Sequence, residues 1–128
     1  MDKMVQAVIG SQTYEFNYSI EVMFDMRDKF GDIQSALNVI EQDDREAFEA
    51  VRWFAVHMAQ DGELCRRADG RDPRPMPDEK SFTVRMRPLD YQHLKQAVVD
   101  AITLGYQREN ADEDEEVDLG LEELNQKK

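Results

Sequence analysis

Residues 43–62 read DDREAFEAVRWFAVHMAQDG, and this stretch says most about the fold. Asp43 and Glu46 have the spacing of an N-cap residue and its N3 acid, which predicts the start of a helix. Gly62 is predicted to end or bend that helix. An apolar surface as wide as this one predicts contacts with more than one neighbouring element. The main stripe holds Ala47, Phe48, Val51, Phe54, Ala55 and Met58, and the adjoining stripe holds Ala50, Trp53 and His57.

Upstream, residues 4–18 predict a β-hairpin with strands at 4–9 and 13–18. Gly10 and Ser11 suit a two-residue type II′ turn, which takes glycine at its first central position. The apolar face of a lone hairpin is only marginally stable in water, so it should pack on the helices. The expected register sets Ala7 opposite Tyr14 and Val5 opposite Phe16.

Two shorter helices are predicted between the hairpin and residue 43. Ser19 can cap the first, and Gly31 is suited to the left-handed residue that ends it. Asp32 can cap the second. The expected apolar faces are Ile20, Met23, Phe24 and Phe30 in the first helix, and Ile33, Ala36, Leu37 and Ile40 in the second.

Downstream, residues 66–77 read RRADGRDPRPMP and predict a surface loop. Residues 78–87 are ambiguous, because SFTVRMR alternates like a strand whereas DEKSF can open a short helix. The last helix is expected to be capped by Asp90, to carry Leu89 and Leu94 as a hydrophobic staple, and to end at Gly105. Its apolar stripe is Tyr91, Leu94, Ala97, Val98, Ala101 and Ile102.

Residues 109–128 hold nine acidic and two basic residues, a composition typical of disorder. The predicted organisation is a single domain at 1–108 followed by a flexible acidic tail at 109–128. The fold class is α+β and mainly α, with the N-terminal hairpin packed on four or five helices. Four isolated apolar residues in the tail suit either a short binding motif or a solvated chain end: Val117, Leu119, Leu121 and Leu124.

Composition narrows the classes of function. The net charge of -12 disfavours nucleic-acid binding, because an acidic surface repels phosphates. Cys65 is the single cysteine, so no disulfide within the chain is expected and a reducing compartment fits. The first ten residues lack the apolar core of a signal peptide, and no stretch approaches the ~18 apolar residues of a membrane helix. We therefore expect a cytoplasmic protein.

Motifs for catalysis, metals and cofactors are missing from the sequence. His57 and His93 lie on separate predicted helices, and no HExxH, CxxC, glycine-rich phosphate loop or nucleophile elbow occurs. With 28 acidic residues in the chain, chance carboxylate pairs are expected. The sequence thus predicts a binding protein and not an enzyme, with no metal and no cofactor.

Two groups of residues are candidates for partner binding. The arginines of the predicted loop, in an otherwise acidic chain, could contact an acidic partner or the chain's own tail, or could simply be solvated. Trp53 lies beside the main stripe, where large aromatics are favoured as binding anchors, but burial in the core explains it equally well. The first group is Arg66, Arg67, Arg71 and Arg74, and the second is Trp53, Phe54 and Met58.

The order of these elements resembles the tail assembly chaperones of long-tailed, siphophage-type bacteriophages and prophages. The matching segments are GSQTYEF at 10–16, DKFGDI at 28–33, the large apolar helix, the charged proline loop, the helix from Leu94 to Gly105, and the acidic tail. The resemblance covers about residues 4–124 and also favours a short helix at 78–87. The family has no catalytic motif to carry over.

The resemblance implies a protein that binds the tape measure protein, keeps it soluble and helps tail tube subunits to assemble around it. Such a protein works in the host cytoplasm and is absent from the mature virion. Self-association through the same apolar surface is a further expectation. The alternative, from charge, is an acidic regulator or nucleic-acid mimic that binds a basic partner, although most of the charge lies in the predicted tail.

Overall fold

The computed structural model describes residues 4–107, so the predictions for the tail at 109–128 and its four apolar residues lie outside the described part. The hairpin consists of β1 (Val5–Ile9) and β2 (Gln12–Phe16). Four α-helices and one short 3-10 helix follow, which confirms the predicted fold class. They are α1 (Ile20–Phe30), α2 (Ile33–Glu41), α3 (Arg45–Ala68), the 3-10 helix η1 (Glu79–Phe82) and α4 (Pro88–Gly105).

The hairpin has the register predicted from the sequence. Val5 pairs with Phe16 and Ala7 with Tyr14 in an antiparallel ladder. Gly10 takes a φ of 65°, the positive value that the first central position of a type II′ turn requires. The face shared by these pairs turns toward the helices, and Phe16 is completely buried there.

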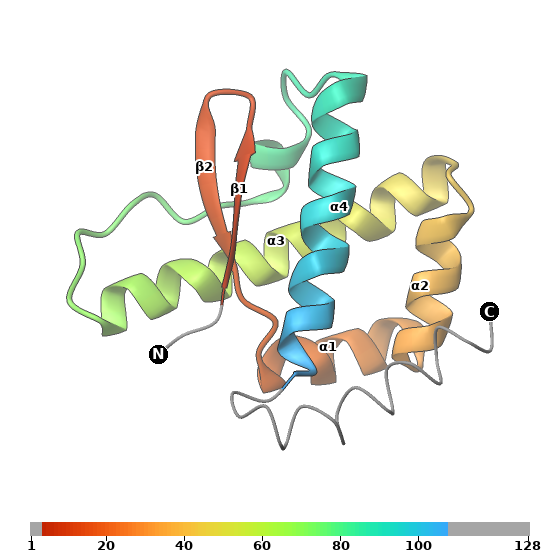
Figure 1. Cartoon of the computed structure of the whole chain (residues 1–128), viewed down its shortest axis with the longest axis horizontal. Coiled ribbons are helices and arrows are strands. Elements are labelled where there is room, and N and C mark those ends of the chain that lie inside the picture. The colour runs from red at the N-terminus through yellow and green to blue at the C-terminus, as the bar shows by residue number, and fades with distance from the viewer. Residues whose placement is uncertain (1–3, 108–128) are drawn as a thin grey trace.

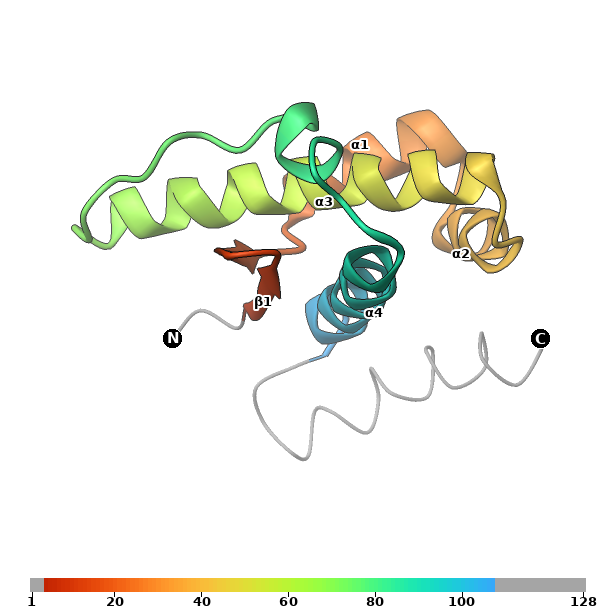
Figure 2. The same ribbon diagram turned by 90° about the horizontal axis from the view of Figure 1, so that it is seen from above.

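The helices enclose the hairpin from two sides (Figure 1). The long helix α3 crosses the hairpin next to β2, and α4 runs along β1, an arrangement that Figure 2 shows from above. Helices α1 and α2 pack near the N-terminal half of α3. The backbone N–H of Asn17 donates to the carbonyl of Met58 at 3.1 Å and so ties the end of β2 directly to α3. None of the helices within residues 4–107 is long and apolar enough to cross a membrane.

Two of the four predicted N-caps are confirmed and two are shifted. Ser19 and Asp32 accept hydrogen bonds from the third residue beyond them, and Gly31 ends α1 with a φ of 94°. The cap of α3 is Asp44 instead of Asp43, because its side chain accepts from the amide of Ala47. Helix α4 begins at Pro88, a residue favoured in the first turn, so Asp90 lies inside the helix and accepts from the Arg87 amide at 3.0 Å.

The apolar face predicted for α1 is partly wrong. Ile20 and Phe24 are 68% and 52% exposed, whereas Val22 and Met26 point into the core. Leu89 is also exposed, so the staple predicted for α4 does not form. The predicted stripes of α2, α3 and α4 are otherwise largely buried, and the short helix at 79–82 confirms the favoured interpretation of the ambiguous segment.

Glycines 62 and 105 both allow close packing, and only Gly105 ends its helix as predicted. Helix α3 continues past Gly62 to Ala68, whereas Gly105 is the last residue of α4. A Cβ atom on Gly62 would lie 2.0 Å from the carbonyl oxygen of Glu15, and one on Gly105 would lie 2.6 Å from the ring of Tyr18. Glycine at these positions therefore lets β2 approach α3, and lets Tyr18, which follows β2, approach α4, more closely than a residue with a side chain would allow.

Candidate functional site

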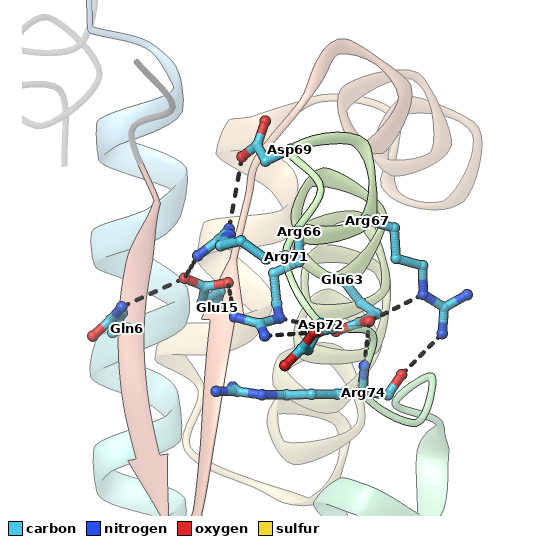
Figure 3. Close-up of polar contacts among 9 residues, drawn as sticks. All are labelled: Gln6, Glu15, Glu63, Arg66, Arg67, Asp69, Arg71, Asp72 and Arg74. Carbon is cyan, nitrogen blue, oxygen red and sulfur yellow. Dashed lines mark hydrogen bonds and ion pairs between the residues drawn. The ribbon is translucent and has the colours of Figure 1, made fainter.

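The loop predicted at 66–77 begins later than expected, because α3 continues through Arg66 and Arg67 to Ala68. The rest of the loop is held against the end of α3. Three of the four candidate arginines surround two carboxylates, Glu63 near the C-terminal end of α3 and Glu15 on β2 (Figure 3). We call this set the arginine network: Glu15, Glu63, Arg66, Arg67 and Arg71.

Glu63 is the centre of the arginine network and is only 4% exposed. One carboxylate oxygen accepts from the backbone N–H of Arg74 at 2.7 Å and from Nε of Arg67 at 3.0 Å. Arg66 lies 3.6 Å from the other oxygen. Burial alone would raise the pKa of Glu63, but these hydrogen bonds and the charges of Arg67 and Arg66 outweigh it and hold the pKa below its ordinary value.

Glu15 connects the network to the hairpin. Arg71 donates to its carboxylate at 3.2 Å, and Arg66 lies 3.8 Å away. Arg66 therefore stands between the buried carboxylates of β2 and α3. Arg66 and Arg67 also donate to the carbonyls of Asp72 and Arg74, which holds the loop against the helix end.

The four arginines chosen from the sequence thus have unequal roles. Arg66, Arg67 and Arg71 already bind carboxylates of their own domain, and within residues 4–107 the guanidinium of Arg74 forms no ion pair. Sequence reasoning missed Glu15 and Glu63, although the spacing of four residues from Glu63 to Arg67 on a helix is a usual ion-pair signal. The network therefore mainly stabilises the fold. Among the four arginines, Arg74 is the one whose guanidinium forms no ion pair within residues 4–107, so it can contact an acidic partner.

We expect Glu63→Gln to destabilise the domain most at neutral pH. The carboxylate of Glu63 has a lowered pKa in the folded state, so its stabilising effect is present above about pH 4.3, the ordinary value for glutamate, and is lost as the pH falls through the lower folded pKa. Urea unfolding of the wild type and of Glu63→Gln at several pH values measures the difference in their free energies of unfolding. It should shrink steadily as the solution is acidified, whereas Glu49→Gln, at an exposed site, should show little difference at any pH. A constant penalty for Glu63→Gln would contradict this account.

A groove lies on the second stripe of α3, far along the helix from the arginine network. Its apolar lining comes from the end of α1, from α2 and from the middle of α3, and it encloses about 510 Å³. We call it the Trp53 groove, with an apolar floor of Phe30, Val39, Ala50, Trp53, Val56 and His57.

Trp53 is partly exposed in this groove and is held by aromatic contacts on several sides. Its ring meets Phe30 edge-on at a centroid distance of 5.4 Å and Phe54 at 5.1 Å. His57 stacks on the indole at 4.0 Å, and its Nδ1 lies 2.9 Å from the Trp53 carbonyl oxygen. The core interpretation of Trp53 therefore holds in part, because the ring packs on the core while remaining partly exposed in the groove, and its role as a binding anchor stays a prediction.

The charged side chains around the groove differ in how they are engaged. Arg52 donates to Thr83 at 3.1 Å, pairs with Glu79 at 3.8 Å and lies over the ring of Phe48. Glu46 and Glu49 are exposed and form no ion pair within residues 4–107. Lys29 of α1 also lines the groove, with its ammonium 5.7 Å from the centroid of the Phe30 ring, so the open charge on the lining is two carboxylates against one ammonium.

Phe54 and Met58 do not belong to the candidate surface. Both side chains are 0% exposed and lie in the hydrophobic core, where Phe54 stacks on Phe30 at 5.5 Å. Neither offers surface to a partner in this structure, so the sequence-based choice of these two residues is corrected and Trp53 alone remains from that group. The sequence did not distinguish them because residues 53 and 54 are neighbours on adjoining stripes of one helix.

Among the described residues, no group of three or more histidine, cysteine, aspartate or glutamate side chains could hold a metal ion. No protein-family model, no curated protein and no solved structure matches the chain. The function of the chain is therefore inferred from the arginine network and the Trp53 groove.

Proposed function

We propose that this chain is a binding protein without catalytic activity that acts as a tail assembly chaperone of a long-tailed phage. It would hold the tape measure protein in the host cytoplasm, assist assembly of the tail tube and be absent from the mature virion. Support comes from the order of elements on which the resemblance rests, a short hairpin followed by helices. The observation that carries the proposal is the partly exposed Trp53 groove, since a chaperone needs apolar surface for its client.

Charge supports the same role. A long helical client with exposed apolar stripes aggregates unless its partner contributes solubility. The net charge of -12 on this chain would keep such a complex in solution. Binding should depend mainly on apolar contact and so should survive ~0.5 M salt, which screens exposed charges but not buried hydrocarbon.

Co-expression with the tape measure protein of the same genome tests the proposal. We expect the tape measure protein to become soluble and to co-purify, whereas expression alone should leave it aggregated. Co-purification with a basic nucleic-acid-binding protein instead would support the alternative of an acidic regulator. Absence of any complex with the tape measure or tail tube protein would overturn the proposal.

We expect Trp53→Ala to weaken tape measure binding by about 2 kcal/mol or more, roughly 30-fold in Kd, while the domain stays folded. The reason is that the partly exposed indole is the largest aromatic side chain that lines the groove. Titration calorimetry measures the affinity and urea unfolding checks the fold. Phe24→Ala removes another half-exposed aromatic, outside the groove, and is the matched control. Equal binding by Trp53→Ala and the wild type would exclude Trp53 as an anchor.

A further inference from the structure

The shape of the Trp53 groove suits a helix laid beside α3. Glu46, Glu49, Trp53 and Val56 follow each other at spacings of three and four residues, so they lie along one side of the helix. At 1.5 Å per residue, the stretch from 46 to 57 is about 17 Å long, the length of about three helical turns. Phe30 of α1 and Val39 of α2 complete the lining, with the Phe30 ring directly against Trp53.

The apolar floor and the open charge specify complementary features of the occupant. Partly exposed Trp53, Val39 and Val56 call for apolar side chains spaced at i, i+3 or i+4, and i+7 on the bound helix. The exposed carboxylates of Glu46 and Glu49 call for lysine or arginine near one end of it. Arg52 does not offset them, because it is already engaged by Glu79 and Thr83, and Lys29 at the end of α1 supplies one positive charge against the two carboxylates.

Charge also indicates which molecule supplies the bound helix: the chain's own C-terminal segment, a second copy of the chain, or a different protein. The chain's own segment 109–128 has nine acidic and two basic residues, so Glu46 and Glu49 would repel it. A second copy carries the same net charge of -12 and is disfavoured for the same reason. A helix from a different, locally basic protein meets both the apolar and the electrostatic requirements.

We infer that the Trp53 groove binds a cationic amphipathic helix of a partner protein, with apolar anchors on the aromatic floor and basic side chains against Glu46 and Glu49. The inference rests on the proposed function only in that the tape measure protein would supply this helix. The chemistry of the groove applies to any client with such a segment.

The fluorescence of Trp53 reports directly on binding in the Trp53 groove, because Trp53 is the only tryptophan in the chain. The probes are two tryptophan-free helical peptides of about three to five turns with identical leucine spacing, one with lysines and the other with glutamates at the polar positions. We expect the lysine peptide to shift the Trp53 emission and to bind at least about tenfold more tightly than the glutamate peptide, as two or more favourable charge pairs would give.

A matched pair of charge reversals separates the groove from the general acidity of the protein. Glu46→Lys with Glu49→Lys should remove or reverse the preference for the lysine peptide. Glu21→Lys with Asp100→Lys should preserve it, although both pairs change the net charge equally, from -12 to -8. Glu21 and Asp100 are exposed and lie outside the groove, and Glu21, like Glu46, is in the first turn of its helix.

Several outcomes would overturn the inference: no binding of either peptide, equal binding of both, or equal effects of the two variant pairs. An emission shift that depends on protein concentration without peptide would identify a second copy as the occupant and would also overturn it. Failure of the proposed function looks different, since the lysine peptide would still bind the groove while the tape measure protein would not. If charge reversal at Glu46 and Glu49 leaves tape measure binding unchanged, the proposed function is still supported, and only the inference about the groove is contradicted.

Discussion

Gly62→Ala is expected to destabilise the domain by about 3 kcal/mol and to lower its Tm by more than about 10 °C. The added Cβ would lie 2.0 Å from the Glu15 carbonyl oxygen and 2.8 Å from its carbonyl carbon. These are backbone atoms, so β2 and α3 would have to separate. Alanine favours a helix by about 0.5–1 kcal/mol over glycine, which is too little to compensate.

Thermal unfolding followed by far-UV circular dichroism measures the loss. Leu64→Ala is the control, because Leu64 lies two residues further along α3 and is 55% exposed. Its Tm should change little. A Gly62→Ala protein as stable as the wild type would mean that β2 does not rest on α3 at this position. The same clash would weaken the arginine network, because Glu15 belongs to it.

Phe54→Ala is expected to cost about 3–5 kcal/mol, a large part of the ~5–15 kcal/mol that stabilises a typical domain. The Phe54 ring is fully buried and contacts both Phe30 and Trp53. Its removal would leave a cavity beneath the Trp53 groove that the surrounding helices can fill only partly.

Urea unfolding of Phe54→Ala and Phe24→Ala compares the same substitution in two environments. Phe24 is 52% exposed with Arg27 over its ring, so its loss should cost less than about 1 kcal/mol. Similar costs for the two variants would show that Phe54 is not core. If Phe54→Ala has the expected large cost, any binding defect of this variant follows from lost stability and not from a lost contact.

Local patterns in the sequence were sufficient to predict most elements of the fold. The register of the hairpin followed from alternation around Gly10, and the caps at Ser19 and Asp32 followed from short-range spacing. These features depend on residues that are near one another in the chain. The two shifted caps differ from prediction by one and three residues. Asp44 takes the role of its neighbour Asp43 at α3, and α4 starts at Pro88, before Asp90.

Features that depend on tertiary contact could not be predicted in this way. The sequence allowed α1 to turn Phe24 or Met26 inward, and only packing against the rest of the domain decides between them. An isolated Gly62 suggests a helix end unless the approach of β2 is known. The cluster of arginines was visible in the sequence. Glu15 and Glu63 are far apart in the chain, so the sequence could not predict that both carboxylates lie next to Arg66.

The packing of β1 against α4 joins the first and last described elements of the chain (Figure 1). The hydroxyl groups of Tyr18, between β2 and α1, and Tyr106, directly after α4, also meet at 3.0 Å. Contacts so distant in sequence require closure of a long loop, which slows folding. Because the hairpin is synthesised before α4, the part of its apolar face that α4 covers stays open on the ribosome until α4 has emerged. The core therefore closes only late in synthesis, and a product truncated before Pro88 would leave that face open to aggregation.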